Sequence, residues 1–211
     1  RARAYNSTSG QWSALNEAFF SIDTVLADAS NLVVSELHYR PANPTTPEEL
    51  AASSDRDDFE FLEMLNIGGS ALDMNDVRFG AGINFNFPDN VVLGVGERLL
   101  LVRDRVAFEA RYGPPAVPSF EYTGRLSNDG EQIVILGSGV GAIKDFIYND
   151  QVPWPTTPDG EGSSLVLINA ASNPDHAESS NWIASRNLGG SPGAAEAAGI
   201  TYDTWAAGFN L

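Results

Sequence analysis

The sequence predicts an all-β domain. Short runs rich in Val, Ile, Phe and Tyr recur along the chain, and clusters of Gly, Pro, Asn and Asp separate them, which is the pattern of strands joined by turns. The 211 residues include 20 glycines and 12 prolines, and 43% of the residues are hydrophobic. This hydrophobic content is enough for the core of one sandwich-sized domain with some peripheral strands.

The first two expected strands form a hairpin. Residues 1–5 and 12–22 lie on either side of the polar stretch Asn-Ser-Thr-Ser-Gly, which favours a turn. Each later strand is expected at a short apolar run bounded by turn residues. In chain order, these runs are residues 31–39, 59–67, 76–79, 83–87, 98–103, 119–124, 131–137, 142–148, 164–169 and 182–186.

Two short helices are expected in the loops. Residues 46–53 begin with Thr46 as N-cap and Pro47 at the first helical position, and acidic residues follow in the first turn, where they favour the helix dipole. Residues 104–113 begin at Asp104 and end at Gly113, a common C-terminal stop.

The strand at residues 59–67 carries two glutamates. Alternation places Phe59, Phe61 and Glu63 on one face and Glu60 on the other, so the two carboxylates are not expected to converge unless a bulge intervenes. We expect Phe59 and Phe61 to fill the core, where each contributes about 1.5–3 kcal/mol. The pair therefore indicates a structural role rather than a catalytic one.

A buried glutamate needs a partner, because an unpaired buried charge is costly. The partners expected for Glu60 or Glu63 are Arg78, Arg103 and backbone amides.

Composition excludes several function classes. Asp and Glu total 28 against 12 Lys and Arg, a formal net charge of −16, which disfavours nucleic acid and anionic membranes as partners. The chain has no cysteine, so disulfides, thiolate metal sites and cysteine nucleophiles are excluded.

The glycines of residues 137–142 miss the dinucleotide-binding spacing and favour a hairpin turn. His38 and His176 are expected to be structural, since no G-x-S-x-G elbow accompanies them.

Two acidic clusters are candidate sites for a hard cation with oxygen ligands, calcium in particular. They are Asp55, Asp57 and Asp58 before the strand at 59–67, and Asp159 with Glu161. The second cluster lacks the alternating carboxylates and the terminal glutamate of an EF-hand loop, and a turn with an Asp cap is its alternative.

Three aromatic residues are candidate ligand-binding residues: Tyr148, Trp154 and Trp182. Exposed aromatic side chains beside polar loops can contact sugars or partner proteins. The alternative is that the two tryptophans fold back onto the sandwich edge, since large aromatics are mostly buried.

A series of sequence segments along residues 31–195 occurs in a distinctive order. The segments are LVVSELHYRP, DDFEFLEMLNIGGSALDMNDVRF, GINFNFP, LLLVRDRVAFEARYG, GRLSNDGEQIVIL, AIKDFIYND, PWPTTPDGEGSSLVLIN and NWIASRNLGGSPGAA. Together they resemble the lamin-tail domain, in the form found on large secreted or surface proteins of bacteria. Residues 41–57 make a longer insertion than the usual loop of that family.

This resemblance implies an immunoglobulin-like β-sandwich that serves as an attachment or interaction module without catalytic residues. By the resemblance, residues 27–197 form the lamin-tail-like sandwich. Residues 1–26 form a hairpin that ends an upstream domain or adds strands, and residues 198–211 form a linker or the start of a following segment. Both ends suggest a piece of a longer polypeptide.

We therefore expect a non-catalytic interaction, adhesion or spacer module of a larger exported bacterial protein, located outside the cell or on its surface. Its expected partners are adjacent domains of the parent protein and a cell-surface protein or polysaccharide, with no membrane insertion and no cofactor. The alternative is a calcium-dependent carbohydrate-binding module. A hydrolase with paired carboxylates is a third hypothesis, which strand alternation disfavours.

Overall fold

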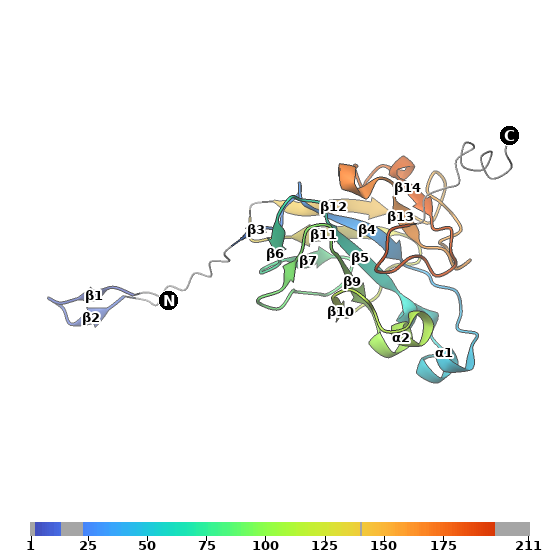
Figure 1. Ribbon diagram of the computed structural model, residues 1–211, viewed down its shortest axis with the longest axis horizontal. Coiled ribbons are helices and arrows are strands. Elements are labelled where there is room, and N and C mark those ends of the chain that lie inside the picture. Colours follow the sequence, from blue (N-terminus) through green and yellow to red (C-terminus); the bar gives the residue numbers. More distant parts are fainter. Residues whose placement is uncertain (1–2, 14–22, 140, 197–211) are drawn as a thin grey trace, which may run out of the picture.

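The structure, a computed structural model, describes residues 3–13, 23–139 and 141–196, and its regular structure consists mostly of β-strands (Figure 1). The strands are β1 (Tyr5–Asn6), β2 (Gln11–Trp12), β3 (Thr24–Leu26), β4 (Leu32–His38), β5 (Phe61–Asn66), β6 (Ala71–Asp73), β7 (Arg78–Ala81), β8 (Val92–Leu93), β9 (Arg98–Val102), β10 (Ser119–Glu121), β11 (Glu131–Leu136), β12 (Ala142–Tyr148), β13 (Leu165–Leu167) and β14 (Trp182–Ala184). The all-β class predicted from the sequence is confirmed.

The strands form several sheets. The largest has six strands in the order β10-β9-β5-β4-β13-β14, and two three-stranded sheets have the orders β12-β11-β7 and β3-β6-β8. β1 and β2 pair as an antiparallel hairpin, as predicted for the turn at residues 6–10. The rest of the strand expected at 12–22 lies outside the described residues, as does the expected linker at 198–211.

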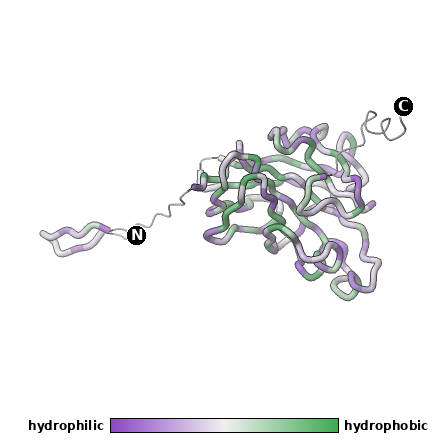
Figure 2. The backbone as a smooth tube through the Cα atoms, in the orientation of Figure 1, coloured by the Kyte–Doolittle hydropathy of each residue, from purple (hydrophilic) through white to green (hydrophobic). Residues whose placement is uncertain are grey.

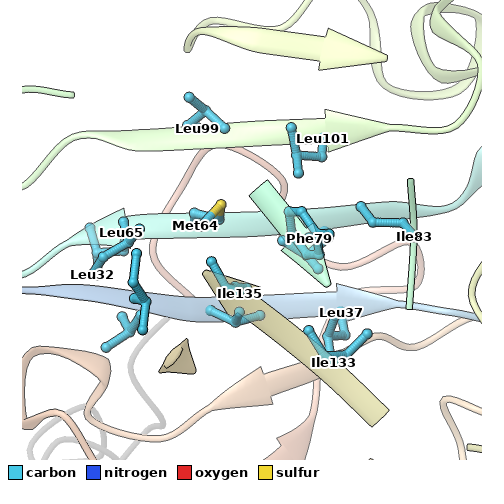
Figure 3. Packing of buried hydrophobic residues seen from close by; sticks show 14 of the residues in the cluster. Leu32, Leu37, Met64, Leu65, Phe79, Ile83, Leu99, Leu101, Ile133 and Ile135 are labelled. Atoms are coloured by element: carbon cyan, nitrogen blue, oxygen red, sulfur yellow. The ribbon is translucent and has the colours of Figure 1, made fainter. Parts of the chain in front are cut away.

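The main core lies between the six-stranded sheet and the β12-β11-β7 sheet. Met64 and Leu101 project from the first sheet, and Phe79, Ile133 and Ile135 face them from the second (Figure 3). Hydrophobic stretches follow the strands of this body, whereas many of the connecting loops are hydrophilic (Figure 2). Burial of these apolar side chains is the main stabilising contribution to the fold.

The opposite face of the six-stranded sheet, called the outer face below, is also covered over part of β5 and β9. Phe61, Leu100 and Val102 form a second buried cluster there with Phe108 of α2 (Arg105–Tyr112). Phe59 and Phe61 are both fully buried, as predicted, and Phe61 lies in this second cluster because Leu62 and Met64 occupy the side that faces the second sheet. Both faces of β5 are apolar and buried, so alternation alone could not tell which one faces the second sheet.

The helices begin and end as predicted. In α1 (Pro47–Ala52), the Thr46 side chain accepts a hydrogen bond from the Glu49 amide and Glu49 completes a capping box. Asp104 caps α2, which ends at Gly113 with a φ of +77°. Three short 3₁₀ turns also occur, η1 (Arg56–Phe59), η2 (Ala170–Ser172) and η3 (Ser179–Asn181).

Two groups of strand predictions need correction. Residues 83–87 form no strand, because the backbone of Asn84 pairs with Thr123 whereas that of Asn86 pairs with Arg78, so no continuous ladder develops. The short strands β3, β6 and β8 were not predicted, because runs of two or three residues carry little periodicity. The hairpin expected around residues 137–142 is present as β11 and β12.

Candidate functional site

A pair of buried glutamates lies on the outer face of the six-stranded sheet. A register shift between Val34 and Glu36 in β4 places Glu36 directly opposite Glu63 of β5. Both residues are 1% exposed. The sequence predicted no such pair, because Glu36 becomes the partner of Glu63 only through the bulge. The one available signal was the polar Ser35-Glu36 step inside an otherwise apolar strand.

Residues 187–196, called the strap below, follow β14 and cross over this pair. The Ser191 amide donates to Glu36 Oε1 at 2.9 Å, and the Gly193 amide donates to Glu63 Oε2 at 2.7 Å. Gly190, with a φ of +79°, lies so close to Glu36 and Ser164 that a Cβ atom would collide with both side chains. Glycine at this position is therefore required by both backbone conformation and space.

Hydroxyl groups and one arginine complete the hydrogen bonding of the pair. Glu36 accepts from the Ser164 hydroxyl and, through Oε2, from the Ser191 hydroxyl at 3.1 Å. Glu63 Oε1 accepts from the Ser35 hydroxyl at 2.6 Å and from Arg98 Nε at 3.0 Å. Each carboxylate oxygen thus has at least one donor from the protein itself.

Burial dominates the electrostatics of the pair. It raises the pKa of Glu36 from 4.5 to about 7, against the hydrogen bond from Ser164, and the nearby Glu63 carboxylate raises it further. Burial also raises the pKa of Glu63, against its bonds to Ser35 and Arg98. Like charges directly opposite each other on neighbouring strands are unfavourable, so Glu36 takes up a proton near neutral pH.

A cavity of about 400 Å³ lies beside the pair, and Arg98, Arg186 and Glu196 contribute to its wall. A carboxylate that acts on a substrate must reach the reacting atom within hydrogen-bond distance. Glu36 and Glu63 instead direct their oxygens to the strap and to neighbouring side chains. The arrangement holds a backbone segment in place and leaves no carboxylate oxygen without a protein donor.

Glu60, the other glutamate considered from the sequence, is fully buried at a separate place, where it caps the η1 turn directly before β5. Its Oε2 accepts from the Tyr122 hydroxyl and the Leu126 amide, both at 2.8 Å, and Arg103 Nη1 lies 4.0 Å from Oε1. Burial raises its pKa to about 8, against these hydrogen bonds. The predicted partners, Arg103 and a backbone amide, are confirmed, whereas Arg78 instead donates to the Asp76 carbonyl.

The first acidic cluster predicted for a cation faces arginine. Asp57 lies 3.7 Å from Arg103 and 3.5 Å from Arg125, and Asp58 lies 3.5 Å from Arg103. Asp55 caps the η1 turn by accepting from the Asp57 amide. These carboxylates are used for local structure and charge pairing.

The second cluster is divided between different surroundings. Asp159 pairs with Arg40, and Glu161 is exposed to solvent. Within residues 3–13, 23–139 and 141–196, no group of three or more acidic or histidine side chains is arranged to hold a metal ion. The geometry gives the calcium interpretation no support.

The aromatic residues predicted to form an exposed platform are buried. Tyr148 is 0%, Trp182 3% and Trp154 9% exposed. The Trp182 ring packs 6.1 Å from Trp154 and 5.9 Å from Phe146, centroid to centroid. The exposed platform is therefore not formed, and the alternative, in which the two tryptophans fold back onto the sandwich, is confirmed, because these rings gain more from burial than from exposure to water.

The two histidines differ in their surroundings. His176 Nε2 accepts from the Val34 amide at 3.2 Å, and Nδ1 lies 3.0 Å from the Pro174 carbonyl oxygen. His176 is therefore structural, as predicted. His38 is fully buried, yet neither of its ring nitrogens has a hydrogen-bond partner.

No helix in the described part of the chain has the length and apolar character needed to cross a bilayer. Comparison with protein-family models, with curated proteins and with solved structures yields no match to this chain.

Proposed function

We propose that this chain is a non-catalytic interaction module of a larger exported bacterial protein, with an immunoglobulin-like sandwich of the lamin-tail type. The order of sequence segments over residues 31–195 supports the family, and the layered all-β fold is compatible with it. The module would present a rigid sheet surface and loops to a cell-surface polysaccharide or protein. Fold alone does not define a ligand, so the site must carry the argument.

The state of the two outer-face glutamates is the observation that carries the non-catalytic proposal. They are the acidic pair that comes together beside a cavity, which is the arrangement a hydrolase would need. Both are 1% exposed, and their carboxylates accept hydrogen bonds from the amides of Ser191 and Gly193. Opening this site to a substrate would remove the donors that compensate the burial of Glu36 and Glu63.

Binding and turnover measured on the same material test this proposal. The 211-residue chain is applied to immobilised polysaccharides and arrayed glycans, and the eluate is analysed for released products. We expect retention on at least one surface without product. If the chain releases product and Glu63→Gln does not, the pair is catalytic. If the chain is retained on none of the glycans, the adhesive role is contradicted.

A further inference from the structure

Strand β12 has an open edge. It is the outermost strand of the β12-β11-β7 sheet and pairs with β11 on one side alone. Its seven residues make it the longest outermost strand in the described part of the chain, since β3, β7, β8, β10 and β14 have two to four residues each. A long open edge presents a row of unpaired N–H and C=O groups, on which another chain can add a strand.

Half of the backbone groups of β12 are without a partner in the protein. In an antiparallel pair, every second residue directs its N–H and C=O groups away from the neighbouring strand. Apart from the pairing with β11, no backbone group of β12 forms a hydrogen bond with another described residue. Buried backbone groups are almost always paired, so the outward groups of β12 face solvent.

A groove of about 260 Å³ lies beside this edge. Residues 142–145 of β12 form one wall, and residues 173–176 form the other. The Lys144 amine fixes the two walls, because it donates to the Ala29 carbonyl at 2.8 Å and to Asn173 Oδ1 at 2.9 Å. Further along the strand, Ile147 is 58% exposed, so an added strand would meet an apolar side chain there.

The charges around the groove are mostly negative. Asp145 and Asp175 line it and are exposed, and Asp28 is exposed nearby. Burial lowers the pKa of Lys144, and the charges of Asp28 and Asp175 oppose this effect, so both carboxylates lie close to the lysine. One cation thus faces three acids, in a chain whose net charge is −16. This balance favours a positively charged partner.

We propose that β12 accepts an extended, basic segment of a partner protein as an additional strand. The backbone ladder would supply affinity, and alternate side chains would supply specificity. Lysine or arginine of the segment would lie beside Asp145 and Asp175, and an apolar side chain beside Ile147. The inference rests on the proposed function and names the partner class and the docking surface of the interaction module.

Two other occupants fit this edge less well. A polysaccharide lacks the regularly spaced amides that continue a β-ladder. A second copy of this chain has the amides, but it would bring two surfaces of net charge −16 together. A basic protein segment satisfies both the open backbone groups and the charge.

Hydrogen exchange with a synthetic peptide tests the site directly. The probe is Lys-Thr-Ile-Thr-Lys-Thr-Ile with blocked ends, which matches the seven residues of β12 and consists mostly of strand-forming residues. Exchange is followed by NMR on the 211-residue chain at saturating peptide. We expect protection to rise at least about tenfold at every second amide of β12, because the others already pair with β11. Amides of β14 should not change.

Two control ligands separate the ladder from the charge. A peptide with glutamate in place of lysine keeps the backbone and should bind at least about tenfold more weakly. Spermidine is a polycation without peptide groups, so it should protect no amide of β12.

Three variants of the chain locate the binding at this edge. Ile147→Lys places a cation on the open strand and should weaken peptide binding at least about tenfold, since it removes the apolar contact and repels the lysines. Val106→Lys makes the same charge change on α2, at a residue that is 67% exposed, and should bind as the unmodified chain does. Asp145→Asn should weaken binding about two- to fivefold, because an exposed ion pair contributes little.

The contrary results distinguish the inference from the proposed function. Exchange in β12 that the lysine peptide leaves unchanged would overturn the inference. Equal binding of the glutamate peptide would overturn the assignment of a basic segment, and dimers of the free chain with the same protection pattern would assign the edge to a second copy. If glycan retention persists while β12 never responds, the inference fails and the proposed function stands. Released product would contradict the proposed function, whatever happens at β12.

Discussion

At the scale of single residues, the protein buries several ionisable groups whose proton affinities shift in opposite directions. Burial raises the pKa of Glu36 to about 7 and that of Glu60 to about 8. Burial lowers the pKa of His38 to about 3 and that of His176 to about 4. The folded state thus holds protons on the two glutamates more tightly than the unfolded state does, and holds protons on the two histidines less tightly.

These shifts predict how stability depends on pH. Between pH 4.5 and 6.5 the glutamates and the histidines have opposite effects on the free energy of unfolding. The glutamates stabilise the folded state more at lower pH, and the histidines do so at higher pH. Above 6.5 the glutamates dominate, since a raised folded pKa gives stability that is lost as pH rises through it. The free energy of unfolding should fall by about 1–2 kcal/mol from pH 6.5 to 8.

Urea unfolding of Glu60→Gln provides the control for this pH dependence. The amide oxygen of glutamine can still accept from Tyr122 and Leu126, so the fold should persist. Most of the decrease between pH 6.5 and 8 should disappear, because Glu60 has the higher pKa of the two glutamates and the smaller contribution of Glu36 is opposed by the histidines. An unchanged slope in this variant would show that Glu60 is not the group responsible.

Gly190 allows a second prediction at the residue scale. Gly190→Ala should destabilise the fold by about 3–5 kcal/mol, because it adds strain at positive φ and a collision with Glu36 and Ser164. Gly113 has nearly the same φ, +77°, with open space around it. Its ψ of 175° places Gly113 in a backbone region that almost only glycine adopts, so Gly113→Ala should cost about 1–3 kcal/mol from strain alone. Equal midpoints in urea unfolding of the two variants would contradict the collision.

At the scale of elements, the strap depends on strands that are distant in sequence. Ser191 is 155 positions from Glu36, to which its amide donates. The strap does not pair with a strand. Its Ser191 and Gly193 amides instead donate hydrogen bonds to the carboxylates of the two glutamates. Helix α2 has a comparable role on the same face, because Phe108 covers Phe61.

Removal of one carboxylate should loosen the strap. Glu63→Ala leaves Arg98 and the Gly193 amide without this acceptor and leaves Ser35 with only the 3.4 Å bond to the backbone carbonyl of residue 63, at a cost of about 3–5 kcal/mol. Hydrogen exchange at the Gly193 amide should rise by at least about a hundredfold, more than at amides in β11. Glu161→Ala, at an exposed residue, should change neither quantity. Equal exchange at Gly193 in both variants would show that Glu63 does not hold the strap.

At the scale of the whole molecule, the acidic composition is balanced locally. The net charge is −16, yet Asp57, Asp58 and Asp159 lie beside arginines. Acidic residues elsewhere, such as Glu161, remain in water. We expect the excess negative charge to favour solubility and to disfavour anionic partners.

Thermal melting provides the test of calcium dependence for the whole chain. The melting temperature should be the same with calcium and with a chelator, because Asp57, Asp58 and Asp159 already face arginines. Magnesium at the same ionic strength controls for screening. A rise of several degrees with calcium alone would contradict this expectation and favour the calcium-dependent module, since an ion that binds only the native state stabilises it.

The sequence by itself determined the features that depend on neighbouring residues. The strand class, the caps of both helices at Thr46 and Asp104, and the hairpin around residues 137–142 all follow from local patterns. The need of Glu60 for a charged or amide partner also followed, because the cost of burying a charge is independent of the fold.

Only the tertiary structure decided which residues form sites. The bulge that opposes Glu36 to Glu63, the strap that covers them, and the groove beside β12 join parts of the chain that sequence patterns cannot relate. The burial of Tyr148, Trp154 and Trp182 was also decided there. Alternation tells which side chains share a face of a strand, but what covers that face depends on packing between distant segments.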